Sequence, residues 1–127
     1  MALTPNLQNR IALVTGGSRG IGRSIALALA AAGADVAVNY HQHTADAESV
    51  VEAIRASGRR ALAVAADVSD SDAIVRMMGR IEAELGSVDV LVSNAGIAII
   101  RGVDELTEDE FDLTLAVNLK SARKSRR

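Results

Sequence analysis

The feature that most constrains the fold is a repeated alternation of short apolar runs with longer stretches of helical periodicity. Each run is continuously apolar, which is typical of strands buried on both faces. Between the runs, apolar residues recur at intervals of three and four, as on a helix that packs against a sheet. Strands that alternate with helices favour a parallel sheet with right-handed crossovers. The sequence therefore predicts an α/β fold, a doubly wound parallel sheet of about four strands at residues 11–14, 36–38, 61–66 and 88–92. Ser69 with Asp72 resembles a capping box at the start of the third helix, and after the fourth strand we expect a loop through Gly102 and then a helix that bears Phe111.

Composition agrees with a single domain whose core is built from aliphatic side chains. The 127 residues are 49% apolar, yet the only aromatic residues are Tyr40 and Phe111. Cysteine is absent, which excludes disulfides and thiolate metal sites and is consistent with a reducing compartment. The sequence shows neither a secretory signal nor a run of 18 apolar residues, so a cytoplasmic location is expected.

A glycine-rich stretch at residues 15–22 follows the first predicted strand and leads into an alanine-rich helical pattern. Glycine lets the backbone turn sharply and approach a ligand closely, and the first turn of the next helix offers unpaired N–H groups to an anion. The stretch therefore predicts a phosphate cradle, with a plain tight turn as the alternative. Its glycines Gly16, Gly20 and Gly22 are spaced G-x-x-x-G-x-G, which differs from the G-x-G-x-x-G of the most familiar dinucleotide fingerprint.

Charges separate near the end of the sequence. Acidic residues crowd positions 104–112, and five of the fourteen basic residues lie at positions 120–127. A terminal basic run is usually a solvated tail, and we expect that here. A nucleic-acid-associated protein is the alternative reading. However, the net charge is -2 and no aromatic residues are interleaved with the basic ones, so neither a nucleic-acid nor a membrane partner is predicted.

Four motifs each lie at the end of a predicted strand or in the helix that follows. The first is the glycine-rich stretch with its leading Thr15. The others are Asp67-Val68 after the third strand, Asn94-Ala95-Gly96 after the fourth, and Asn118 in the helical pattern beyond them. Each motif alone also suits a turn, a helix cap or a surface position. Their order and separations over residues 10–119 resemble those of the short-chain dehydrogenase/reductase family, so the chain resembles the N-terminal cofactor-binding half of a family member.

The resemblance implies a Rossmann-like sheet with strand order 3-2-1-4 and a dinucleotide at the carboxyl ends of the strands. It also implies the role of each motif. The glycine-rich stretch would hold the pyrophosphate, Asp67-Val68 would meet the adenine ring, Asn94-Ala95-Gly96 would line the cofactor site, and Asn118 would be the catalytic asparagine. The predicted cofactor contacts are Thr15, Gly16, Ser18, Arg19, Gly20, Ile21, Gly22, Tyr40, His41, Asp67, Val68, Asn94, Ala95 and Gly96.

The residues after the second predicted strand indicate which dinucleotide is preferred. A ribose 2'-hydroxyl is typically held by an acid at the end of that strand, whereas a 2'-phosphate needs a cation there. The family's acidic position falls on Tyr40, so the acid is missing. Arg19 resembles the basic residue of NADP-preferring members, and His41 occupies a place where such members often carry arginine. These features predict NADP(H) over NAD(H), with no role assigned to His43.

Most of the family's catalytic residues have no counterpart in this sequence. By resemblance, the intact reaction moves hydride between the nicotinamide and a carbonyl or alcohol carbon of a small molecule, assisted by a serine and a Tyr-x-x-x-Lys pair. The single tyrosine, Tyr40, is followed four residues later by Thr44, so only Asn118 of that set is present. We therefore expect a truncated dehydrogenase, arising through a frameshift, an early stop or a deliberate shortening, that lacks normal catalysis. A non-catalytic dinucleotide-binding module is the alternative.

Truncation has an expected consequence for association. An incomplete Rossmann-like domain at residues 1–119, followed by a basic tail at 120–127, would leave the fourth strand as an apolar edge with unpaired amides. Such an edge predicts a homo-oligomer, or self-association through the fourth strand.

Overall fold

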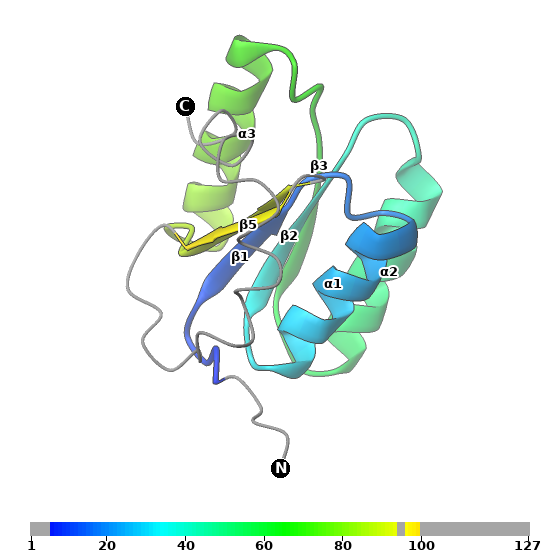
Figure 1. The fold of residues 1–127 in the computed structure, drawn as a ribbon, viewed down its shortest axis with the longest axis vertical. Coiled ribbons are helices and arrows are strands. Elements are labelled where there is room, and N and C mark those ends of the chain that lie inside the picture. Colours follow the sequence, from blue (N-terminus) through cyan, green and yellow to red (C-terminus); the bar gives the residue numbers. More distant parts are fainter. Residues whose placement is uncertain (1–5, 94–95, 100–127) are drawn as a thin grey trace.

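The computed structural model describes residues 6–93 and 96–99, and in this part the chain forms one sheet with helices on both faces (Figure 1). Strands and helices alternate as the sequence predicts. The elements are β1 (Ile11–Val14), α1 (Gly20–Ala31), β2 (Asp35–Tyr40), α2 (Thr44–Ala56), β3 (Ala61–Ala65), α3 (Ser71–Glu84), β4 (Val90–Ser93) and β5 (Gly96–Ile99).

The sheet has the strand order β3-β2-β1-β4-β5, and the first four strands are parallel, which confirms the predicted order 3-2-1-4. Val14 at the end of β1 lies opposite both Val38 of β2 and Val92 of β4. The carboxyl ends of these strands therefore meet at one edge of the sheet, which is the upper edge in Figure 1. Helices α1 and α2 cover one face of the sheet, and α3 covers the other.

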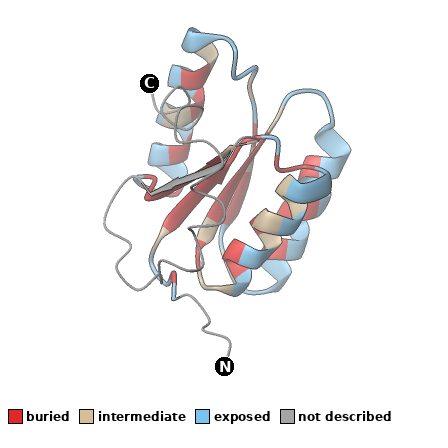
Figure 2. Cartoon of the chain, in the orientation of Figure 1, coloured by how far each residue is buried: buried red, intermediate tan, exposed pale blue. Residues whose placement is uncertain are grey.

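The core is divided by the sheet into two apolar clusters, and β1 to β4 are largely buried between them (Figure 2). Alternate residues of β1 enter opposite clusters, because successive side chains of a strand point to opposite faces. Ala12 and Val14 pack with the α1 and α2 side, whereas Ile11 and Leu13 pack with Met77 of α3. All four residues of β1 are buried, as its unbroken apolar run predicts.

Strand β5 corrects two expectations. The sequence predicted a loop from the end of the fourth strand through Gly102, but Gly96–Ile99 forms a strand that pairs antiparallel with β4. Leu91 lies opposite Ala98 and Ser93 opposite Gly96 in this pairing. The prediction that the fourth strand is an exposed edge was therefore wrong: β4 has β1 on one side and β5 on the other. A strand with free amides gains hydrogen bonds by pairing, and the chain supplies the partner from its own next residues.

The start of α3 corrects a smaller detail. The pattern of Ser69 with Asp72 predicted a capping box, but the N-cap residue is Asp70, whose carboxylate accepts hydrogen bonds from the backbone N–H groups of Asp72 and Ala73. The helix predicted around Phe111 and the basic tail lie outside the described residues. Within the part of the chain that the structure covers, no helix is long and apolar enough to cross a membrane.

Candidate functional site

The glycine-rich loop joins β1 to α1 at the carboxyl edge of the sheet, where the sequence predicts the phosphate cradle. Gly16 and Gly20 have φ angles of 67° and 60°, in the left-handed region that side chains with a Cβ rarely adopt. Gly22 is required for another reason, because a Cβ placed there would lie 2.3 Å from the carbonyl oxygen of Gly16. The first turn of α1 therefore packs directly on the backbone of the loop.

Thr15 fixes the beginning of this loop to the sheet. Its backbone N–H donates to the carbonyl oxygen of Val92 at 2.8 Å, and its hydroxyl reaches the same oxygen at 3.4 Å. The side chain is buried. Thr15 is thus placed at the base of the loop, where it links the end of β1 to the end of β4.

Asn39 fixes the middle of the loop, and the sequence analysis missed it. This side chain is only 3% exposed, and its Oδ1 accepts a hydrogen bond from the backbone N–H of Gly16 at 3.3 Å. Its Nδ2 lies within hydrogen-bond distance of the carbonyl oxygens of Tyr40, Val64 and Ala66, the nearest at 3.1 Å. The available signal was a polar amide in an otherwise apolar strand, because a buried amide needs partners for both its ends.

The N-terminus of α1 opens to solvent at the end of the loop. Arg19 is the N-cap residue, has an extended backbone and makes no side-chain capping bond. A Cβ added at Gly20 would meet nothing within 4 Å, so Gly20 borders open space. Ile21 projects from the same turn and is 80% exposed. A helix end with unpaired N–H groups and open space above it suits an anionic ligand.

A pocket of about 530 Å³ lies beside this helix end and brings together the loop and the residues after β2. Six of the predicted cofactor contacts line it, together with Gln42 and His43, which the sequence analysis did not assign to the site. None of the described lining residues is acidic, and Arg19 is permanently charged. The lining residues are Gly16, Ser18, Arg19, Gly20, Tyr40, His41, Gln42 and His43.

Asp67 and Val68 follow β3 at the same edge, outside the lining of this pocket. Asp67 accepts a hydrogen bond from the Ser69 hydroxyl at 2.6 Å and another from the Ser69 backbone N–H at 2.9 Å. These two bonds, with a smaller electrostatic contribution from His41, lower the pKa of Asp67 below its ordinary value. Val68 is 41% exposed, so an apolar side chain faces solvent near the candidate cofactor site.

Together these features fit a dinucleotide. The loop has glycines where the backbone turns back and where the helix packs on it, and the helix end is open to an anion. Exposed Ile21 and Val68 offer apolar contacts, and the adjoining pocket is basic. Of the other predicted site residues, Gly96 begins β5, while Asn94, Ala95 and Asn118 lie outside the described residues.

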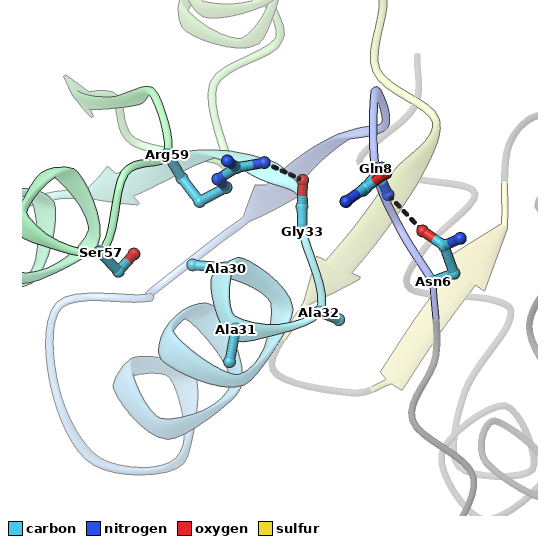
Figure 3. Close-up of a pocket in the computed structure, with 8 residues that line it drawn as sticks. All are labelled: Asn6, Gln8, Ala30, Ala31, Ala32, Gly33, Ser57 and Arg59. Carbon is cyan, nitrogen blue, oxygen red and sulfur yellow. Dashed lines mark hydrogen bonds between the residues drawn. The ribbon is translucent and has the colours of Figure 1, made fainter.

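A second pocket, of about 590 Å³, lies at the opposite edge of the sheet (Figure 3). It is formed where α1 and α2 end, and helix carboxyl ends carry partial negative charge. Arg59 donates a hydrogen bond to the carbonyl oxygen of Gly33 at 3.2 Å, as the close-up shows. Arg59 thus binds a carbonyl group just beyond the end of α1. This pocket is remote from the glycine-rich loop.

Comparison with known proteins agrees with the site. Residues 10–125 match the family described as short chain dehydrogenase. Versicolorin reductase 1 of Dothistroma septosporum is 42% identical over 114 residues, which cover 90% of this chain and 43% of that protein. The 3-oxoacyl-(acyl-carrier-protein) reductase of Staphylococcus epidermidis is 48% identical over 112 residues, which cover 88% of this chain and 46% of that protein.

Solved structures give the same result. A short chain dehydrogenase from Burkholderia cenocepacia, solved in complex with NADP, is 46% identical and superposes with a TM-score of 0.71, covering 95% of this chain and 49% of that one. The chain spans slightly less than half the length of the relatives it matches. With its loop geometry, strand order and family match in agreement, this chain belongs to the short-chain dehydrogenase/reductase family.

Proposed function

We propose that this chain is the dinucleotide-binding half of a short-chain dehydrogenase/reductase and that it prefers NADP(H) over NAD(H). The single observation that carries the preference is the pocket after β2, where Arg19 and His41 face a common space and the described lining contains no carboxylate. A 2'-phosphate needs cationic partners and is repelled by an acid, whereas a 2'-hydroxyl is usually held by one. The NADP complex of the Burkholderia cenocepacia relative supports this proposal.

Each part of the site has a proposed task. The backbone of the loop, with Gly16, Gly20 and Gly22, holds the pyrophosphate, and Ile21 adds apolar contact. Arg19, Ser18, Tyr40 and His41 surround the 2'-phosphate. Asp67-Val68 lies against the adenine ring. Asn94, Ala95 and Gly96 line the cofactor site, and Asn118 is the catalytic asparagine in the family's arrangement.

The family reaction is hydride transfer between NADP(H) and the carbonyl or alcohol carbon of a small molecule, and the bound nicotinamide supplies the hydride. The 127 residues hold one tyrosine, which is not part of a Tyr-x-x-x-Lys pair. We therefore propose that this chain binds the cofactor without turning over a carbonyl substrate. Action in the cytoplasm is part of the proposal and is supported by the absence of cysteine.

Calorimetric titration of the chain with NADPH and with NADH tests the preference. We expect NADPH to bind more tightly than NADH. The Arg19→Gln substitution should weaken NADPH binding by about tenfold, the value of one charge-assisted hydrogen bond, and should change NADH binding less than about twofold. Arg76→Gln is the matched control, because Arg76 is exposed on α3 and does not line the pocket. Equal affinity for the two dinucleotides would contradict the proposal.

A carbonyl-reductase assay with the same samples tests the second part. NADPH binding without oxidation of NADPH is expected across a panel of ketones and aldehydes. Turnover by the 127-residue chain would show that the reaction proceeds without the family's Tyr-x-x-x-Lys pair.

Self-association also remains a proposal, although its predicted route through an open β4 edge is lost, because β4 pairs with β5. Light scattering at high concentration measures it directly, and a strictly monomeric chain would contradict it.

A further inference from the structure

Both histidines of the chain lie in the same pocket. The sequence contains two, His41 and His43, and both line the space beside Arg19. An imidazole ordinarily titrates near pH 6.5, so its charge changes within the physiological range, whereas a guanidinium is always charged. The described lining therefore combines one permanent positive charge with two side chains whose charge depends on pH.

We propose that His41 and His43 are specificity-determining residues that couple the choice between NADP(H) and NAD(H) to pH. This inference rests on the proposed function, because it requires that the 2'-phosphate enters this pocket. A phosphate monoester is mostly dianionic at pH 7, and protonated imidazoles beside it form charge-assisted hydrogen bonds. NAD(H) carries a hydroxyl at that position and gains nothing comparable from the added protons.

The charged groups around the two imidazoles come from several elements. Arg19, at the start of α1, lines the same pocket as the two histidines and is always positively charged. Asp67, after β3, interacts electrostatically with His41 and favours its charged form. Asp46 adds a carboxylate in the first turn of α2. A bound phosphate dianion offsets the positive charge of Arg19, so cofactor binding and proton binding favour each other.

Thermodynamic linkage sets the size of the effect. If the phosphate moves the titration midpoint of one imidazole upward by about one pH unit, the affinity for NADP(H) falls about fivefold between pH 6.5 and pH 8.5. The phosphate itself titrates near pH 6, which slightly weakens binding at the lower pH and opposes the histidines. If both histidines contribute equally, their fivefold effects multiply, and after the opposing phosphate titration the preference for NADP(H) over NAD(H) should fall by about twentyfold over this interval.

Proton NMR of the imidazole Cε1–H signals tests the coupling directly, since the chain has no other histidine. We expect NADPH to move the titration midpoints of these signals to higher pH, and NADH to leave them nearly unchanged. Calorimetry at pH 7 in buffers of different ionisation enthalpy should show that NADPH binding takes up protons. If only the phosphate changed its protonation state, binding would release protons. The direction of proton exchange therefore distinguishes the histidines from the phosphate.

A double variant, His41→Asn with His43→Asn, supplies the control. Both side chains are exposed, and asparagine suits the N-cap position that His43 holds at α2, so the fold should persist, as circular dichroism can verify. The double variant should still prefer NADPH through Arg19, with the pH dependence of that preference removed. His41→Arg should raise NADPH affinity more at pH 8.5 than at pH 6.5, because a guanidinium keeps its charge at high pH.

The outcomes separate this inference from the function on which it rests. NADPH binding with the same preference at pH 6.5 and pH 8.5, and imidazole signals that respond equally to both dinucleotides, would overturn the coupling alone. No binding of NADPH at either pH would overturn the proposed function and the coupling together.

Discussion

Gly22 lies where the first turn of α1 comes closest to the backbone of the glycine-rich loop. A Gly22→Ala change places a Cβ 2.3 Å from the carbonyl oxygen of Gly16, so the loop or the helix must shift. We expect a loss of about 1–3 kcal/mol in the free energy of unfolding and at least about tenfold weaker NADPH binding. Urea denaturation and calorimetry measure the two effects.

Gly79 provides the matched control, because it also lies inside a helix, α3, but a Cβ there would meet nothing within 4 Å. Gly79→Ala should stabilise the chain by up to about 1 kcal/mol through helix propensity and leave NADPH binding unchanged. If the two alanine variants behave alike, the close contact at Gly22 has no energetic importance.

The Asn39 side chain connects the glycine-rich loop to β2 and β3 through hydrogen bonds. Asn39→Ala should lower the free energy of unfolding by about 1–3 kcal/mol, because it leaves the N–H of Gly16 and the carbonyl oxygens of Val64 and Ala66 without this partner. Asn39→Asp keeps an acceptor for Gly16 but turns a carboxylate oxygen toward two carbonyl oxygens. It should therefore cost at least as much at pH 7. An Asn39→Asp variant of native stability would contradict this account.

Asp67 gives the site a pH dependence of its own. Because hydrogen bonds from Ser69 lower its pKa from the ordinary 3.8, the folded chain binds this proton more weakly than the unfolded chain. The resulting stabilisation is present above the ordinary value and is lost as the pH falls through the folded-state pKa. Ser69→Ala should move the pKa of Asp67 back upward, as a carboxyl NMR titration would show. An unchanged midpoint in that variant would assign the shift to His41 instead.

At the scale of the element, α3 begins at the cap that the structure shows rather than at the one the sequence predicted. Asp70→Ala removes the acceptor for two backbone N–H groups and should cost about 1 kcal/mol of unfolding free energy. Ser69→Ala removes no such acceptor and should cost clearly less in a urea titration. A larger loss of unfolding free energy for Ser69→Ala than for Asp70→Ala would instead support a capping box that begins at Ser69.

The elements also show where the sequence was sufficient and where it was not. Unbroken apolar runs located β1, β2, β3 and β4 to within about two residues, because burial on both faces leaves a local signal. Strand β5 was missed, because Gly96–Ile99 forms a strand through pairing with a neighbouring strand, and no local periodicity reports that. Asp70 was missed because two adjacent polar residues both suit a cap, and only the backbone geometry separates them.

At the scale of the whole molecule, the candidate site too could be predicted from the sequence only in part. The place of the glycine-rich loop at the carboxyl edge followed from strand order, whereas the resemblance to the family pointed to Arg19, Tyr40 and His41, which the structure places around one pocket. The roles of Asn39 and His43 could not be predicted, because they depend on which backbone groups and loops meet in space.

Cofactor binding should be visible as stability of the entire domain. NADPH at about 100 times its dissociation constant should raise the free energy of unfolding by about 2.7 kcal/mol, because only the folded chain presents the site. NADH at the same concentration should raise it less, in proportion to its weaker binding. A thermal shift that is identical for both dinucleotides would contradict the preference.

The sharp change in burial after Asn39 has a practical meaning for redesign. Asn39 is held within the sheet, whereas Tyr40 is half-buried and residues 41–43 are exposed. Burial therefore gives way at Tyr40 to the exposed lining of the proposed cofactor pocket. Under the proposed function, substitutions at residues 41–43 and at Arg19 should change the dinucleotide preference without unfolding the chain.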